Sequence, residues 1–207
     1  MDNILNKTSK YVTNLLSEKL SKDMYYHSLA HTQEVVANAK EIGENSGLSS
    51  EEMELVLLAA WFHDTGFTNS YEGHENTSLR IAENFLSKNN YPSEKINKII
   101  NAIKITNLTF KPENLIENVI RDADLYYLGT TEFFNQYELL RKEWCIKLNK
   151  IYTEIEWLEL NIDFFFSHVF YTEYANKKLS PQKEINLAKL KKILSINNGH
   201  KPVKDIK

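Results

Sequence analysis

The sequence predicts a single all-α domain of roughly ten helices. Apolar residues recur at helical spacing along most of the chain. Only six of the 207 residues are glycine, about 3%, under half of the usual share of about 7%. Sandwiches, barrels and Rossmann sheets need many glycine turns, so the scarcity of glycine favours long helices joined by short polar loops. The aromatic share of 12% argues against a disordered chain.

The helices expected in the first third surround one very apolar segment. The first runs from residue 4 to about 21, and the second spans 32–46 and stops at Gly47, a residue that commonly ends helices. Two serines and two glutamates, residues 49–52, then supply an N-cap and acidic first-turn residues for a third helix. This helix continues to about His63 and is apolar nearly all round, so we expect it at the centre of the fold.

The remaining elements alternate with polar loops. A loop at 65–73 precedes a helix at 75–88, and Pro92 begins another that carries isoleucines through Ile103. A loop at 106–112 follows. The next patterns predict one or two short helices and then three long ones; the expected ranges are 114–128, 131–148, 152–178 and, beginning at Pro181, 181–194.

No repeat, low-complexity tract or long linker divides the chain. We therefore expect one domain over residues 1–196, with a motif-bearing part at about 25–129, C-terminal helices at 131–195 and a polar tail at 197–207. The net charge of -3 gives no basic face for specific nucleic-acid binding. A lone cysteine, the lack of a signal-peptide pattern and the lack of a membrane-length apolar run favour a cytoplasmic protein.

The most informative chemical unit is His63-Asp64, which ends the apolar helix. A buried carboxylate costs several kcal/mol unless it is paired or binds a metal. An imidazole and a carboxylate together suit Mn, Fe, Ni, Co, Zn or Mg. His31, at the start of the preceding helix, and Asp124, in RDADLYYLG, are the other candidate ligands. Four protein ligands would hold one divalent ion and leave positions open for water and substrate.

Four segments in this order resemble the HD superfamily of metal-dependent phosphohydrolases, an all-helical family named for its adjacent His-Asp pair. The segments lie between Tyr25 and Gly129, and they read YHSLAHTQEVV, LAAWFHDTGF, GHENTSLRIA and RDADLYYLG. The resemblance implies that the metal ligands are His31, His63, Asp64 and Asp124. It also implies that Asp64 orients or deprotonates the attacking water. Asp122 is an alternative to Asp124 as the metal ligand. If Asp124 is the ligand, we expect Asp122 either to support the ligands from behind or to lie at the surface.

The family resemblance also gives His74 a role, as a catalytic residue that contacts the substrate phosphate or a second metal. Between Asp64 and Asp124 the chain has no other histidine, whereas dinuclear members of the family use at least two more. One metal and hydrolysis are therefore favoured over a di-iron oxygenase. A non-catalytic nucleotide-binding or regulatory module is the remaining alternative.

Further residues are candidates for lining the substrate pocket. His27 lies one helical turn before His31 and can share its face, and Lys104 follows an apolar helix from which it can reach a phosphate. His168 and Lys183, from the aromatic C-terminal half, complete the candidate substrate-binding set. Cys145 is expected to be a small buried hydrophobe. The sequence thus predicts a phosphohydrolase for a nucleotide or another small phosphate ester, with one divalent metal and a possible homo-oligomeric state.

Overall fold

The expectation of an all-α fold is confirmed by a computed structural model, which describes residues 3–199. Within that range the chain forms nine α-helices and two 3-10 segments, with no strand. The α-helices are α1 Ile4–Lys19, α2 Leu29–Asn45, α3 Ser50–Phe62, α4 His74–Lys88, α5 Ser93–Ile105, α6 Leu115–Asp124, α7 Phe133–Lys147, α8 Glu154–Ser167 and α9 Glu173–Gly199. The short segments are η1 Thr65–Thr68 and η2 Tyr126–Gly129.

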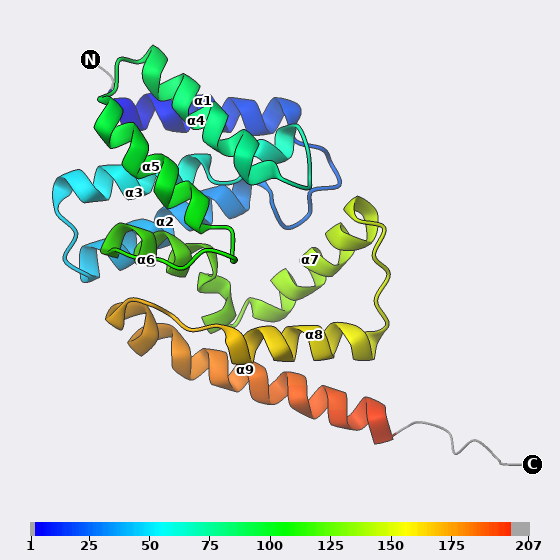
Figure 1. The fold of residues 1–207 in the computed structure, drawn as a ribbon. Coiled ribbons are helices and arrows are strands. Elements are labelled where there is room, and N and C mark those ends of the chain that lie inside the picture. The colour runs from blue at the N-terminus through cyan, green and yellow to red at the C-terminus, as the bar shows by residue number, and fades with distance from the viewer. Residues whose placement is uncertain (1–2, 200–207) are drawn as a thin grey trace, which may run out of the picture.

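Helix α3 lies at the centre of the N-terminal group of helices, as its apolar sequence predicts. It packs against α1, α2, α4, α5 and α6 (Figure 1). Ser49 and Glu52 form a capping box at its start, so the helix begins where the serine pair indicates. Most of its side chains between Leu55 and Phe62 are buried on all sides. Because α3 is enclosed, the residues that follow its C-terminus are also placed deep inside the protein.

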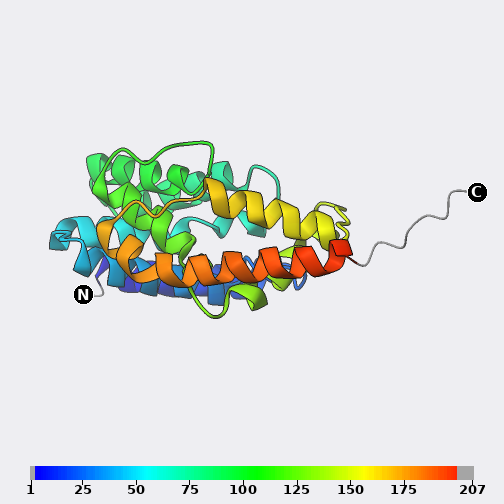
Figure 2. The same cartoon turned by 90° about the horizontal axis from the view of Figure 1, so that it is seen from below.

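The C-terminal helices cover one side of this group. Helix α8 packs against α9, and the two lie side by side in both views (Figures 1 and 2). Helix α9 also packs against η2, which directly follows α6. An aromatic cluster joins α7 to α8, with Phe133 beside Phe165 at 4.8 Å and Trp144 beside Trp157 at 5.5 Å between ring centroids. The chain is not long and apolar enough in any helix of residues 3–199 to span a membrane.

The predicted helix boundary at Pro181 is wrong. Pro181 lies inside α9, which begins eight residues earlier, and the expected helix over 152–178 is broken between Ser167 and Glu173. His168 has an extended backbone there, with φ -81° and ψ 136°. Helix α9 continues to Gly199, so the first residues of the expected tail are helical, while 200–207 lie outside the described residues.

The break has a physical cause in Asp122, which is completely buried near the end of α6. Its carboxylate accepts hydrogen bonds from the backbone N–H of Tyr171 at 2.8 Å and of Thr172 at 2.7 Å, and from the Thr172 hydroxyl at 2.8 Å. The same hydroxyl accepts the Ala175 N–H at 3.1 Å and so caps α9. Asp122 therefore lies neither at the surface nor among the candidate ligands: it joins the C-terminal helices to α6.

Replacement of Asp122 by alanine should lower the free energy of unfolding by about 2–4 kcal/mol, because the buried N–H and hydroxyl of Thr172 and the partly buried N–H of Tyr171 lose their acceptor. Urea denaturation followed by circular dichroism measures this change. The exposed Glu138→Gln variant on α7 is the control and should unfold like the wild type. Equal stability of the Asp122→Ala variant and the wild type would contradict the proposed attachment of α9.

Candidate metal centre

Three helix ends bring the predicted ligands together. Ser28 caps α2 by accepting the N–H of His31 at 3.3 Å, which places His31 in the first turn. His63 follows the last residue of α3, and its N–H still bonds to Ala59 O at 2.9 Å. Asp124 is the last residue of α6. Because α3 packs against both α2 and α6, these ends meet inside the protein.

The Nε2 atoms of the two candidate imidazole ligands lie close to oxygens of both candidate carboxylates. The Nε2 of His31 is 3.5 Å from Asp64 Oδ2 and 3.3 Å from Asp124 Oδ1. The Nε2 of His63 is 3.1 Å and 3.6 Å from the same two oxygens. His31, His63 and Asp124 each offer one ligand atom within 4.8 Å of the others.

This arrangement fits a metal ion. Ligands that lie about 2.0–2.2 Å from one ion are about 2.9–3.5 Å from each other, close to the separations found here. The buried Nε2 atoms of His31 and His63 and the Oδ2 of Asp64 have no hydrogen-bond partner within residues 3–199. His63 Nδ1 donates to Ala60 O at 2.7 Å, which leaves the lone pair of Nε2 directed toward the carboxylates. What sets these three buried atoms apart is that they face one another at one point, where a bound cation would satisfy all of them.

The site is strongly polarised before any ion binds. Burial by itself would lower the pKa of His63, but the Asp64 carboxylate, with Asp124, raises it to about 9. Burial would likewise raise the pKa of Asp64, but His63 and the other nearby imidazoles hold it far below its usual value. A divalent cation held by the same atoms would satisfy both carboxylates.

His74 lies beside Asp64 because of a close approach at Gly66. A Cβ at Gly66 would be only 1.9 Å from the carbonyl oxygen of His74, so only glycine lets η1 approach the start of α4 this closely. The His74 ring stacks on Phe67 at 3.6 Å between centroids, and its Nδ1 is 3.1 Å from Tyr71 O. Its Nε2 lies 3.7 Å from Asp64 Oδ1.

His27 belongs to a second buried cluster built around Glu143 of α7, which is fully buried. The carboxylate accepts the backbone N–H of Tyr26 at 2.8 Å and of His27 at 3.1 Å, and it bonds to His27 Nδ1. It also accepts the Tyr71 hydroxyl at 2.8 Å. Burial would lower the pKa of His27, but the hydrogen bond to Glu143 raises it. Glu143 was not among the site residues predicted from the sequence. It stands among the charged residues of RKEWCIK, and an acid in such surroundings carries no signal of burial.

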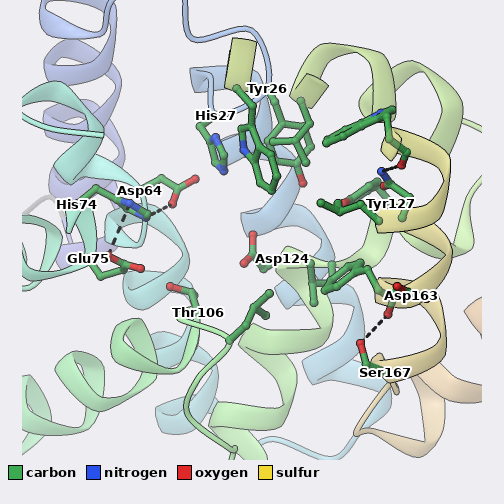
Figure 3. A pocket seen from close by; sticks show the side chains of 18 residues that line it. Tyr26, His27, Asp64, His74, Glu75, Thr106, Asp124, Tyr127, Asp163 and Ser167 are labelled. Carbon is green, nitrogen blue, oxygen red and sulfur yellow. Dashed lines mark hydrogen bonds and ion pairs between the residues drawn. The ribbon is translucent and has the colours of Figure 1, made fainter. Parts of the chain in front are cut away.

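A cavity of about 660 Å³ opens beside the ligand cluster, between the N-terminal group and helices α7 and α8 (Figure 3). Asp64, His74 and Glu75 lie at one end, and side chains of α8 lie at the other (Figure 3). The lining residues are Tyr26, His27, Asp64, His74, Glu75, Thr106, Leu108, Asp124, Leu125, Tyr127, Leu140, Trp144, Trp157, Leu160, Asn161, Asp163, Phe164 and Ser167. The cavity has the size and the mixed polar and apolar walls of a small-molecule site.

Three of the predicted substrate-binding residues do not line this cavity. The ammonium of Lys104 lies over the Phe110 ring at 4.4 Å. Lys183 donates to His168 O at 2.5 Å, and the His168 ring is buried with both nitrogens unpartnered in the described part of the chain. His168 contributes instead to a separate cavity of about 250 Å³ with Arg121 and Tyr171. Cys145 is exposed, so the expectation of a buried cysteine is wrong, because its side of α7 is left uncovered.

Comparisons with known proteins agree with these observations. The model of the HD domain family matches residues 28–128. No curated protein matches the sequence. Three solved structures share the fold.

One of them is a predicted HD superfamily hydrolase from an uncultured Thermotogales bacterium, with a TM-score of 0.59, 18% identity and coverage of 90% of this chain and 91% of that chain. A protein of Lactobacillus plantarum gives a TM-score of 0.68, 15% identity and coverage of 93% and 98%. The Lin1889 protein of Listeria innocua gives a TM-score of 0.61, 18% identity and full coverage of both chains.

Single replacement of His31, His63 or Asp124 by alanine should lower the affinity for Mn²⁺ at least about 100-fold, since the loss of a ligand costs more than the loss of its outer hydrogen bonds. Calorimetric titration with MnCl₂ measures the affinity, and circular dichroism checks that each variant is folded. His200→Ala, in the tail outside the described residues, is the histidine control. Wild-type affinity in all three variants would rule out a metal centre here.

The buried His168 should make folding sensitive to mild acid. Burial, with the nearby charges of Lys183 and Arg121, lowers its pKa to about 3, so it stays neutral in the folded protein while the unfolded chain takes up a proton below about pH 6.5. Stability is therefore lost as the pH falls through this range. From pH 6.5 to 5 the free energy of unfolding of the wild type should fall by about 1–2 kcal/mol relative to His168→Phe, as measured by urea denaturation. Parallel pH profiles for the two proteins would contradict this.

Proposed function

This chain is an HD-domain protein, and on that premise we propose that it is a metal-dependent phosphohydrolase that cleaves a phosphate ester of a nucleotide or another small molecule. The observation that carries the proposal is the set of unpartnered imidazole and carboxylate atoms of His31, His63 and Asp64 beside Asp124, at the wall of a substrate-sized cavity. The Thermotogales protein of the same fold is itself described as a predicted HD superfamily hydrolase.

One divalent ion held by His31, His63, Asp64 and Asp124 would polarise the phosphoryl oxygen and lower the pKa of a water molecule. Asp64 is suited to orient that water and to accept its proton, because its Oδ1 faces the cavity side near His74. The low pKa of Asp64 keeps the carboxylate ionised at neutral pH, so that it can accept a hydrogen bond from this water and orient it.

The two remaining imidazoles of the pocket are placed to bind the phosphate. His74 is held by Phe67 and Tyr71, with Nε2 directed toward the Asp64 side of the site. His27 has Nδ1 occupied by Glu143, and its raised pKa favours the imidazolium, so that Nε2–H is a donor for a phosphate oxygen or for the leaving oxygen. Fixed donors at the positions where charge develops stabilise the transition state.

In the direct test, purified protein with Mn²⁺ is incubated with p-nitrophenyl phosphate, bis(p-nitrophenyl) phosphate and nucleotides. Asp64→Asn should lower kcat at least about 100-fold, because it cannot accept the proton of water. Glu138→Gln is the control and should retain wild-type kcat.

His74→Ala separates phosphate binding from metal binding: it should lower kcat/KM about 10-fold or more with unchanged metal content.

If His63→Ala and Asp64→Ala keep full metal content and full activity, the assignment is wrong. Nucleotide binding without turnover would instead indicate a non-catalytic module. Two irons per chain with oxygen uptake would indicate an oxygenase.

A further inference from the structure

The candidate pocket has two chemically different ends. At one end lie Asp64, Asp124 and the imidazoles of His27 and His74. At the other end α7 and α8 contribute an apolar wall, whose main members are Leu140, Trp144, Leu160 and Phe164, and α8 adds three polar residues, Asn161, Asp163 and Ser167. Figure 3 shows side chains of α8, among them Asp163 and Ser167, across the cavity from Asp64, His74 and Glu75. Any molecule with its phosphate at the ligand cluster would extend toward this wall.

We propose that the substrate carries a single phosphate on a bulky apolar group, which binds against the wall formed by α7 and α8, and that polyphosphates are poor substrates. This inference rests on the proposed function. In the reaction, water adds its oxygen to phosphorus, the ester P–O bond breaks, and the apolar alcohol leaves with the proton.

The apolar wall of the cavity is incompletely buried. Leu140, Trp144, Leu160 and Phe164 all keep part of their surface open to the cavity. Trp144 is held in place by Trp157 at 5.5 Å and Tyr152 at 6.2 Å between ring centroids. A preformed apolar surface inside a concave site favours a ligand that covers it. A small polar group such as glycerol would leave that surface in contact with water.

The charge of the side chains that line the cavity is predominantly negative. Four carboxylates line the cavity, from Asp64, Glu75, Asp124 and Asp163, and none of the described lining residues is a lysine or an arginine. One divalent ion offsets two of these charges. Sites that bind polyphosphates use lysine or arginine together with metal ions to neutralise the additional phosphates. Here a second or third phosphate would meet carboxylates with no lysine or arginine among the described lining residues, so a single phosphate is favoured.

Two matched pairs of substrates test the two parts of the proposal, with Mn²⁺ present throughout. The kcat/KM for 1-naphthyl phosphate should exceed that for glycerol 1-phosphate at least tenfold, because only the former covers the apolar wall. The kcat/KM for AMP should exceed that for ATP at least tenfold, because the two share the nucleoside and ATP adds two phosphates that would meet the carboxylates of the cavity. Equal values in the first pair, or a preference for ATP in the second, would overturn the proposal.

A double variant, Leu140→Ala with Leu160→Ala, locates the apolar subsite. It should reduce the ratio of kcat/KM for 1-naphthyl phosphate to kcat/KM for glycerol 1-phosphate at least fivefold. Leu139→Ala, on the neighbouring position of α7 and outside the cavity lining, is the control and should keep the wild-type ratio. A ratio that is the same in all three proteins would show that the wall does not bind the substrate.

A binding measurement separates this inference from the proposed function. Trp144 and Trp157 line the cavity, so quenching of tryptophan fluorescence by 1-naphthol reports occupation of the apolar end without any hydrolysis. The dissociation constant should rise at least fivefold in the double variant and stay unchanged in Leu139→Ala. If no phosphate ester is turned over, the proposed function fails while this result still supports the apolar subsite. Equal binding of 1-naphthol by all three proteins overturns it.

Discussion

Two imidazole nitrogens and two carboxylates meet where α2 begins and where α3 and α6 end, at a point nearly closed to water. Ionised groups in such surroundings are costly unless each is matched by an opposite charge, a hydrogen bond or a metal. The three helices can therefore end where they do only because their terminal side chains satisfy one another or share an ion. The central position of α3, enclosed by five other helices, makes this convergence possible.

Two further buried carboxylates extend the same principle to the C-terminal helices. Asp122 accepts the backbone N–H groups of Tyr171 and Thr172, just before α9 begins. Glu143 of α7 accepts groups from Tyr26, His27 and Tyr71. Both join segments that are far apart in the sequence, since a single carboxylate can accept several hydrogen bonds at once. Through these contacts α7, α8 and α9 are placed across from the ligand cluster, and the space between becomes a cavity with one polar and one apolar end.

The predictions from sequence were most successful where the signal was local. Ser49 and Glu52 marked the start of α3, and the apolar run after them indicated its central position. Pro181 wrongly indicated the start of a helix, because proline is common at the first position of helices. The true start of α9 is determined by the contact of Thr172 with Asp122. Cys145 was misjudged because helical periodicity does not say which face of α7 a neighbouring element covers.

By itself, the sequence determined the helical class and most helix boundaries, because caps and periodicity are local properties. The four candidate metal ligands followed from the resemblance of four short motifs to a family, and they stay a prediction. Only the tertiary structure decided which other residues surround that centre. It brought in His27 through Glu143, left Lys104, His168 and Lys183 outside the cavity, and placed the apolar wall of α7 and α8 opposite the ligands. These outcomes depend on contacts between residues up to 117 positions apart, such as Tyr26 and Glu143. Packing decides the balance of burial and hydrogen bonding there, and it leaves no local pattern in the sequence.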